Sequence, residues 1–200
     1  MKGDLNTLLD FVRFTHEIRN IQRAILFEHD ERYENDMEHG YQMAFVAWFL
    51  IENDKLPLNK LRCAGMAMMH DVIEVHSGDT HAHASVEERA AHEKKGKVAI
   101  EKLKKQWPSF KSMHKLIDEY ERRKTPESKF VYALDKLMPI INIYLYRGRS
   151  WQLQNVTMQD MKDIKVGKID LSPELNEYYK EFLRIVEKQP ELFGKNWGEL

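Results

Sequence analysis

Three segments of the chain are apolar around most of a helical circumference, and this feature constrains the fold more than any other. They are YQMAFVAWFLI within residues 37–52, LRCAGMAMMHDVIEV within residues 58–76, and FVYALDKLMPIINIYLY after Thr125–Pro126. A helix without a polar face is buried by its neighbours, so we expect these three helices to be central. Elsewhere apolar residues recur at i, i+3 and i+4, and the alternation typical of strands is hard to find. The sequence therefore predicts an all-α fold.

Five further helices are expected around the central three. The first runs from about Leu5 toward Ile25 after a cap at Asp4, and the polar stretch FEHDERYEND follows it. Pro57 is expected in the first turn of the helix over 58–76. The remaining helices are a charged one from Ser85 to about Gln106, one after Trp107–Pro108, a short one after Thr157, and a last one opened by Ser172–Pro173. No repeat, low-complexity tract or linker interrupts them, so we expect one domain over residues 1–200.

Composition excludes several classes of protein. The chain has 31 Lys and Arg against 32 Asp and Glu, so it lacks the basic excess needed for bulk nucleic-acid binding. No stretch approaches the ~20 apolar residues of a membrane span, and the start MKGDLNTLLD lacks the pattern of a secretion signal. The single cysteine, Cys63, lies among small and apolar residues, where we expect it to pack rather than react. It has no partner for an internal disulfide, so we expect a soluble cytoplasmic protein.

Ionisable residues interrupt all three central helices: His39, His70 with Asp71, and Asp135. Burying a carboxylate without compensation costs several kcal/mol, so something must compensate. Two imidazoles and two carboxylates that converge would hold a divalent cation such as Mn, Co, Fe, Ni, Zn or Mg, and suit Ca less well. Alternatively, His39 could be a hydrogen-bonded core residue, Asp135 could pair with a cation, and Asp71 could cap a helix. Three central helices would then each need a separate explanation for a buried polar group.

The residues after His70 suggest hydrolytic chemistry. Within HDVIEVHSGDT, Glu74 lies one helical turn after His70 and could accept a proton from water at the ion. Asp79 follows the turn at Ser77–Gly78 and could fold back over the same cavity. The alternatives are an exposed helix charge for Glu74 and a turn former for Asp79. The pattern is not the HExxH of zincin peptidases, so that class is disfavoured.

Candidate phosphate-binding residues precede the second helix. Arg19 and Arg23 carry guanidinium groups that match phosphate oxygens, and Arg23 is favoured because it lies on an otherwise apolar stretch. An ordinary surface role is the alternative for either arginine. The region after the HD pair is rich in histidine, which could contact substrate or form a rival metal cluster, although a solvated loop is the simpler interpretation. These histidines are His76, His81, His83 and His92.

The pattern H…HD…D, carried by His39, His70–Asp71 and Asp135, resembles that of the HD-domain metal-dependent phosphohydrolases. HDVIEVHSGDT resembles the HDxxExxxGD form of the bacterial 5'-deoxynucleotidase branch and its relatives, and MEHGYQMA resembles the E-H-S segment of that branch. The resemblance covers roughly residues 19–160. It implies an α-helical domain whose metal ligands are these four residues, with Glu74 as catalytic carboxylate and Asp79 contacting or assisting the substrate.

The resemblance also implies a homodimer, to which the aromatic residues Tyr144, Tyr146 and Trp151 could contribute contacts. Two departures from the family pattern are visible. Gly40 stands where the family commonly has Ser, and Ala24 follows Arg23 where the deoxynucleotidases have a tryptophan against the sugar. The second departure removes the reason to expect selectivity for deoxyribose.

The expected function is therefore hydrolysis of a small phosphate ester, a nucleoside 5'-monophosphate, with a divalent metal ion. Two alternatives remain open at this point. One is a nucleoside triphosphate hydrolase or phosphodiesterase of the same fold. The other is a non-catalytic module that binds a nucleotide or a partner protein, against which the presence of Glu74 and Asp79 argues.

Overall fold

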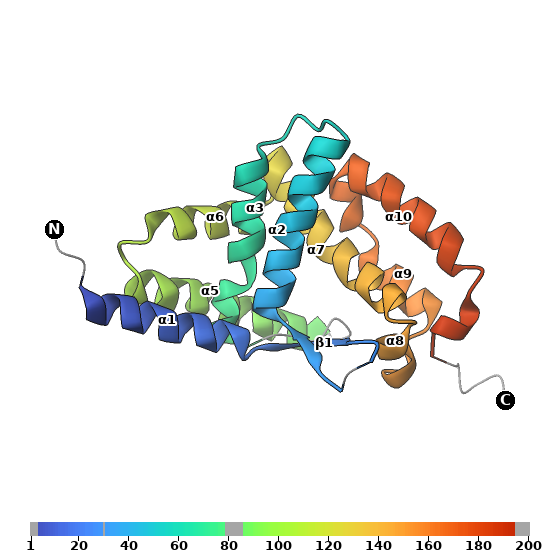
Figure 1. Cartoon of the computed structure of the whole chain (residues 1–200), viewed down its shortest axis with the longest axis horizontal. Helices are drawn as coiled ribbons and strands as arrows, with labels where there is room; N and C mark the ends of the chain where they lie inside the picture. The colour runs from blue at the N-terminus through green and yellow to red at the C-terminus, as the bar shows by residue number, and fades with distance from the viewer. Residues whose placement is uncertain (1–3, 30, 79–85, 195–200) are drawn as a thin grey trace.

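Helices dominate the computed structural model, which describes residues 4–29, 31–78 and 86–194 (Figure 1). The helices are α1 (Leu5–Arg19), α2 (Asp36–Asn53), α3 (Lys60–Met69), α4 (Glu74–Ser77), α5 (Val86–Gln106), α6 (Lys111–Arg122), α7 (Pro126–Leu145), α8 (Arg149–Leu153), α9 (Met158–Lys165) and α10 (Pro173–Val186), with the 3₁₀ helices η1 (His70–Ile73), η2 (Ile169–Leu171) and η3 (Pro190–Leu192). Two short strands, β1 (Gln22–Leu26) and β2 (Tyr33–Asn35), form an antiparallel hairpin. The predicted helical fold class is confirmed, with this hairpin as an addition.

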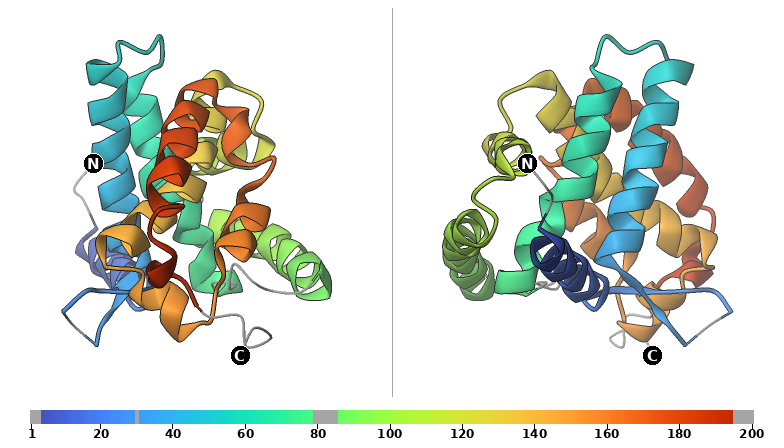
Figure 2. Two further views of the ribbon diagram at one scale, coloured as in Figure 1. Left: turned by 90° about the vertical axis from the view of Figure 1, so that its right-hand side faces the viewer. Right: turned by 60° about the vertical axis from the view of Figure 1, so that its left-hand side comes forward.

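The largest hydrophobic cluster joins α2, α3 and α7 and extends to the C-terminal helices. Met43 on α2, Met66 on α3 and Leu134 on α7 are fully buried in it. On the other side of α7, the last helix α10 covers the cluster with Leu175 and Phe182, as its apolar stripe predicts (Figure 2). The sequence therefore identified the helices that form the centre of the molecule.

A second hydrophobic cluster joins α1, η1, α5 and α6. Phe14 of α1 packs at 5.5 Å, between ring centroids, from Trp107 at the end of α5. Val72 and Ile73 belong to this cluster, whereas the preceding α3 belongs to the first. The chain therefore passes from one cluster to the other at His70 and Asp71.

The outer face of α2 corrects the expectation that this helix is buried all round. Tyr41, Phe45 and Phe49 expose 69%, 71% and 61% of their surface, while Met43 and Ala47 are fully buried on the opposite face. Within the described residues, nothing covers this outer face. Hydrophobic periodicity alone could not reveal this, because an exposed apolar residue and a buried one look the same in a sequence.

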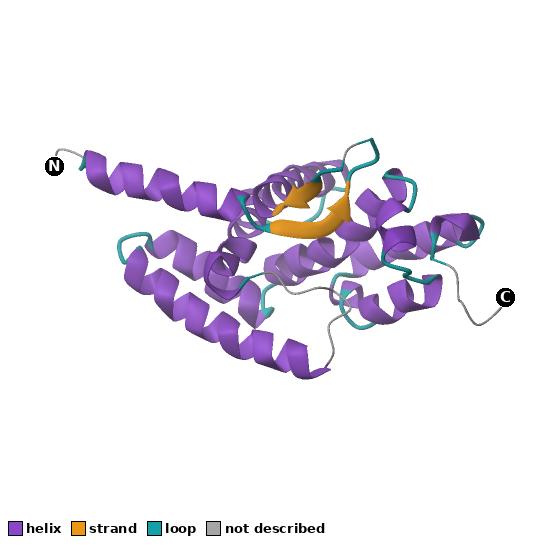
Figure 3. Ribbon diagram, turned by 90° about the horizontal axis from the view of Figure 1, so that it is seen from below, coloured by secondary structure: helices purple, strands orange, loops and turns teal. Residues whose placement is uncertain are grey.

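The first helix ends earlier than expected, at Arg19, and the segment expected to complete it forms β1 instead. This segment is held as a strand by contacts from distant residues. The amide of Leu26 donates to Ser150 Oγ at 2.8 Å, and Gln154 Nε2 donates to the carbonyl of Ala24 at 2.7 Å. The hairpin, drawn in orange in Figure 3, leads directly into the N-terminal end of α2, which is the lower end of this helix in Figure 1. Tertiary hydrogen bonds therefore override a local pattern that favoured helix.

Most predicted helix starts are confirmed by their capping residues. Thr125 and Thr157 form capping boxes for α7 and α9, and Ser172 caps α10. The expected role of Pro57 is wrong, because α3 is capped by Asn59 and begins at Lys60. Ser85, expected to cap the charged helix, lies outside the described residues. The short helix α8 was not expected.

Two further expectations about environment can be checked. Cys63 is fully buried, and burial raises the pKa of its thiol to about 12, so it packs rather than reacts. Among the described residues, no helix combines the length and hydropathy needed to cross a lipid bilayer.

Candidate metal centre

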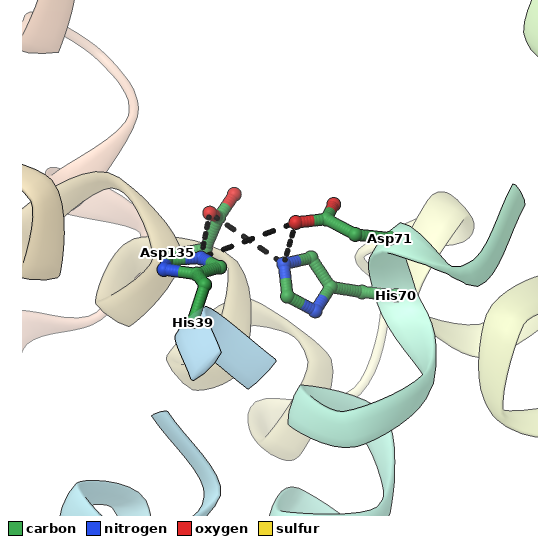
Figure 4. A group of neighbouring side chains, drawn as sticks. All are labelled: His39, His70, Asp71 and Asp135. Carbon is green, nitrogen blue, oxygen red and sulfur yellow. Dashed lines mark hydrogen bonds and ion pairs between the residues drawn. The ribbon is translucent and has the colours of Figure 1, made fainter. Parts of the chain in front are cut away.

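Four side chains converge where α2, η1 and α7 meet (Figure 4). His39 Nε2 lies 3.2 Å from Asp135 Oδ1, and His70 Nε2 lies 3.0 Å from Asp71 Oδ2. Crossing distances are 3.6 Å from His70 Nε2 to Asp135 Oδ1 and 4.0 Å from His39 Nε2 to Asp71 Oδ2. One ligand atom from each residue lies within 4.8 Å of all the others. The sequence prediction that these residues come together is therefore correct.

Local structure fixes each of these side chains in turn. His39 follows the Asn35–Glu38 capping box that starts α2, and it is 0% exposed. Asp135 lies in the middle of α7 among fully buried residues. At Met69 the α-helix ends and η1 begins, which is a departure from the single helix expected over 58–76. This tighter turn brings the adjacent side chains of His70 and Asp71 to one point.

The ring of His70 is oriented as a metal ligand requires. Its Nδ1 donates a hydrogen bond to the carbonyl of Ala67 at 2.8 Å, so Nε2 points into the cluster and is the nitrogen that an ion would bind in place of a proton. His70 Nε2 is buried and has no hydrogen-bond partner within the described residues. A buried imidazole nitrogen left in this way, between two carboxylates, fits a bound cation.

Opposite charges in the cluster stabilise the ionised form of each group. Burial by itself lowers the pKa of His70, but the negative charges of Asp71 and Asp135 beside the ring outweigh it and raise that pKa to about 10. Burial likewise opposes ionisation of Asp71, yet His70 and Arg23 hold its pKa well below the usual range. Lys136 and His39 lower the pKa of Asp135 against the same penalty. The site therefore keeps both carboxylates ionised, as binding of a cation requires.

Arg23 reaches the cluster from β1 rather than from the helix expected there. Its Nη1 donates to Asp71 Oδ2 at 2.6 Å and to Asp36 Oδ1 at 3.2 Å, and its Nε lies 3.4 Å from Glu34 Oε2. The surrounding carboxylates outweigh burial and raise the pKa of Arg23 further above its ordinary value. The guanidinium group is therefore a fixed positive charge beside the candidate ligand Asp71.

Several residues that contact the cluster were not singled out from the sequence. Glu34 Oε2 lies 3.5 Å from His39 Nδ1, and the hydroxyl of Tyr120 donates to Asp135 Oδ2 at 2.7 Å. Lys136 Nζ lies 2.6 Å from the same oxygen. The position of Lys136 directly after Asp135 was a usable signal. Glu34 is only 2% exposed although it lies in a polar stretch, and no local pattern distinguishes it or Tyr120.

The other predicted site residues are placed differently. Glu74 begins α4 with a half-buried side chain, and its negative charge contributes to the raised pKa of Arg23. The side chain of Arg19 is exposed and makes no hydrogen bond or ion pair within the described part of the chain. His76 Nε2 lies 2.9 Å from Gln106 Oε1, at the end of α5. Asp79, His81 and His83, and the side chain of His92, lie outside what the structure describes.

A pocket of ≈ 130 Å³ lies beside the cluster, between α2 and α3. His70 and Asp71 form part of its wall, and Met37, Tyr41 and Met68 contribute apolar surface. Gly40 also lines it, and a Cβ at this position would approach the carbonyl oxygen of Ala67 to 3.2 Å. The absence of a side chain at Gly40 therefore lets α2 pack closely on α3 beside the carbonyl that orients His70.

Comparison with known proteins agrees with this geometry. The 5'-deoxynucleotidase HDDC2 of Homo sapiens is 28% identical over 178 residues, which are 88% of this chain and 84% of that protein. Its counterpart in Xenopus laevis is 32% identical over 165 residues, covering 81% and 79% of the two chains. A solved structure from Magnetospirillum magnetotacticum, described as a predicted metal-dependent phosphohydrolase, superimposes with a TM-score of 0.79 at 25% identity and 96% coverage of both chains. The family model of the HD domain matches residues 15–176, and this chain therefore belongs to the HD domain family.

Proposed function

We propose that this protein is a divalent-metal-dependent phosphohydrolase that acts on nucleoside 5'-monophosphates. The observation that carries the proposal is the convergence of His39, His70, Asp71 and Asp135 at the centre of the fold. Membership of the HD domain family, and similarity to proteins named 5'-deoxynucleotidase, support a nucleotide as the substrate. We further propose that residues 1–200 form one domain of this type and that the protein acts in the cytoplasm.

The four converging residues are proposed to hold one ion. When bound, a divalent ion polarises a phosphoryl oxygen and makes water more acidic. Two imidazoles and two carboxylates suit Mn, Co, Fe, Ni or Zn, and Mg is also accepted by carboxylates. Because the pKa of His70 is raised, the ion must displace a proton from this ring. Metal binding should therefore weaken as the pH falls.

Two side chains are proposed to act on the substrate itself. Glu74 would accept a proton from the attacking water, because its carboxylate lies half-buried in the turn that follows His70 and Asp71. Arg23 would neutralise phosphoryl oxygens with the part of its guanidinium group that does not face Asp71. Asp79 as a substrate contact and Arg19 as a phosphate contact stay predictions.

Selectivity for deoxyribose is not part of the proposal. Ala24 follows Arg23 on β1 and offers only a methyl group at the position where the family resemblance leads us to expect a tryptophan. We therefore propose that ribose and deoxyribose 5'-monophosphates are both accepted.

The homodimer implied by the family resemblance is also proposed, although one of the three aromatic residues suggested for its contacts is buried within the chain. Trp151 is buried and stacks on Phe193 at 4.5 Å between ring centroids. Tyr144 packs against Phe182, and Tyr146 packs against Phe27, in the same chain. Trp151 is therefore shielded from a partner, whereas the half-buried Tyr144 and Tyr146 keep exposed surface that a partner could contact.

The direct test measures phosphate release from a panel of nucleoside mono-, di- and triphosphates and cyclic phosphodiesters, with each metal added in turn. We expect release from 5'-monophosphates only, and none after chelation. Release chiefly from triphosphates or diesters would replace the substrate class while retaining the site. No release from any ester with any metal would leave a non-catalytic nucleotide-binding module.

Two variants separate metal binding from proton transfer. Elemental analysis of a variant carrying both His70→Ala and Asp71→Ala should show loss of bound metal. Glu74→Gln should keep the metal but lose roughly 10²- to 10⁴-fold in rate, the usual contribution of a general acid or base. Metal content equal to the parent in the double variant, or a parental rate in Glu74→Gln, would contradict the respective assignment.

A further inference from the structure

One buried lysine has no role in the proposed mechanism. Lys165 is the last residue of α9, and only 6% of it is exposed. One turn earlier on the same helix, Nζ of Lys162 lies 2.7 Å from Glu187 Oε1. Lys165, in contrast, makes no hydrogen bond or ion pair with any residue that the structure describes. Lysine is almost never buried without a partner, so the position of this side chain needs an explanation.

Lys165 lies beside the candidate metal centre. Apart from burial, the groups that act most strongly on its amine are Lys136, Asp135, Lys168 and Arg23. Asp135 is one of the four candidate ligands (Figure 4), and Nζ of Lys136 lies 2.6 Å from its Oδ2. The helix η2, which follows α9, packs on α7, the helix that carries Asp135. The amine therefore approaches the cluster from α9, whereas Arg23 approaches it from β1.

Positive charge dominates the surroundings of this amine. Lys136, Lys168 and Arg23 disfavour a proton on it, and among these neighbours only Asp135 favours one. Asp135 is already paired with Lys136. Burial and the neighbouring cations together lower the pKa of Lys165 to about 7. An anion bound at this position would therefore be attracted by several cations at once.

This arrangement costs free energy of folding. A charged amine has to leave water and come to lie among like charges, whereas an apolar side chain of similar volume would be buried there at a gain. Proteins keep destabilising residues of this kind mainly where function depends on them. A bound anion therefore explains the burial of Lys165 better than the packing of α9 does.

The chemistry of the site indicates which anion fits. A phosphate monoester carries close to two negative charges at neutral pH and offers three strongly accepting oxygens. The ammonium group of lysine is a compact charge with three donors that can turn toward such oxygens. The cluster beside Lys165 is also where the proposed function places the phosphoryl group of a nucleotide.

We propose that Lys165 binds an oxygen of the substrate's phosphate group and, together with Arg23, neutralises the phosphoryl charge. This inference rests on the proposed function, since it assigns one more contact to the same substrate. Lys136 continues to hold Asp135. A phosphodiester carries only one negative charge at the phosphorus, so Lys165 also favours monoesters over diesters.

Binding of inorganic phosphate to the metal-loaded full chain tests this contact without turnover. Isothermal titration calorimetry at pH 7 compares the parent with Lys165→Met. The dissociation constant for phosphate should rise roughly 10- to 100-fold, the usual effect of losing a hydrogen bond to a charged group. Bound metal should equal that of the parent, and the urea midpoint of unfolding should be higher. For a nucleoside 5'-monophosphate, KM should rise more than kcat falls.

Lys162→Met is the matched control, because it removes an amine from the same helix at a position that pairs with Glu187. It should bind phosphate as the parent does. Lys165→Gln provides a second variant without the charge, and circular dichroism establishes that each variant is folded.

Three results would overturn the proposal. The first is a phosphate dissociation constant that neither Lys165 variant changes. The second is a parent that holds metal but binds no phosphate. The third is a loss of metal that accompanies the loss of phosphate binding, since Lys165 would then act through the ion. A parent that binds phosphate through Lys165 but hydrolyses no ester would contradict the proposed function alone, so the two failures are distinguishable.

Discussion

The hydroxyl of Tyr120 is expected to control how tightly the four-residue cluster holds its metal ion. It donates a 2.7 Å hydrogen bond to Asp135 Oδ2, and Lys136 Nζ approaches the same oxygen to 2.6 Å. Asp135 Oδ1 faces His39 and His70 instead. The two contacts on Oδ2 therefore fix the rotation of the carboxylate that presents Oδ1 to the ion. Tyr120→Phe removes one of them without changing the packing of the ring.

The size of the effect follows from these contacts. A hydrogen bond to a charged group is worth about 1.5–3 kcal/mol, and loss of a contact that orients a metal ligand typically weakens metal binding ~10- to 100-fold. Because Lys136 still holds Oδ2 in the variant, we expect the lower end of this range. The metal dissociation constant of Tyr120→Phe should therefore rise roughly tenfold, which corresponds to about 1.4 kcal/mol.

Competition with a chromophoric chelator at neutral pH measures this constant. The matched control is Tyr132→Phe, because the rings of Tyr132 and Tyr120 lie 5.9 Å apart and the Tyr132 hydroxyl has no hydrogen bond within the described residues. The control should bind metal as the parent does. An unchanged constant in Tyr120→Phe would refute the reasoning, and equal weakening in both variants would assign the effect to ring packing.

Three further substitutions test the fold. Lys165 is 6% exposed, and burial together with the charge of Lys136 lowers its pKa in the folded protein to about 7. In the unfolded chain its pKa is the ordinary ~10.5. The free-energy cost of burying the charged amine is therefore absent above pH ~10.5, grows as the pH falls, and reaches its full size below pH ~7. Lys165→Met should therefore raise the free energy of unfolding, measured in urea, by on the order of a few kcal/mol at pH 7 and by little at pH 10. A gain in stability that does not depend on pH would contradict this. Ser150→Ala removes the hydrogen-bond acceptor of the buried Leu26 amide and should lower the free energy of unfolding by ~1–3 kcal/mol in the same assay. An unchanged stability would mean that other contacts hold β1 in place. Gly148 has φ +68°, and a Cβ added at this position would lie 2.0 Å from the carbonyl oxygen of Leu192. Gly148→Ala should therefore lower the midpoint of thermal unfolding by several degrees. An unchanged midpoint would mean that this turn moves freely.

Local sequence determined most of the helices and the four candidate metal ligands. Thr125, Thr157 and Ser172 mark helix starts because a capping side chain satisfies backbone groups of its own first turn, and this interaction depends on neighbours in the sequence alone. The four candidate ligands were visible because ionisable residues in apolar helices require compensation. No other feature of the sequence points so directly to the place where the chain performs chemistry.

Tertiary structure decided the features that depend on distant partners. Residues 22–26 form a strand because Ser150 and Gln154, more than 120 positions away, bond their backbone. Glu34 and Tyr120 contact the candidate site for the same kind of reason, since nothing in their own segments marks them as buried beside it. The exposed outer face of α2 could not be predicted either. Hydrophobic periodicity shows that a residue is apolar but not which neighbour covers it. Spacing along the chain fixes which side of a helix is apolar, and only the packed structure decides whether this chain or a partner buries it.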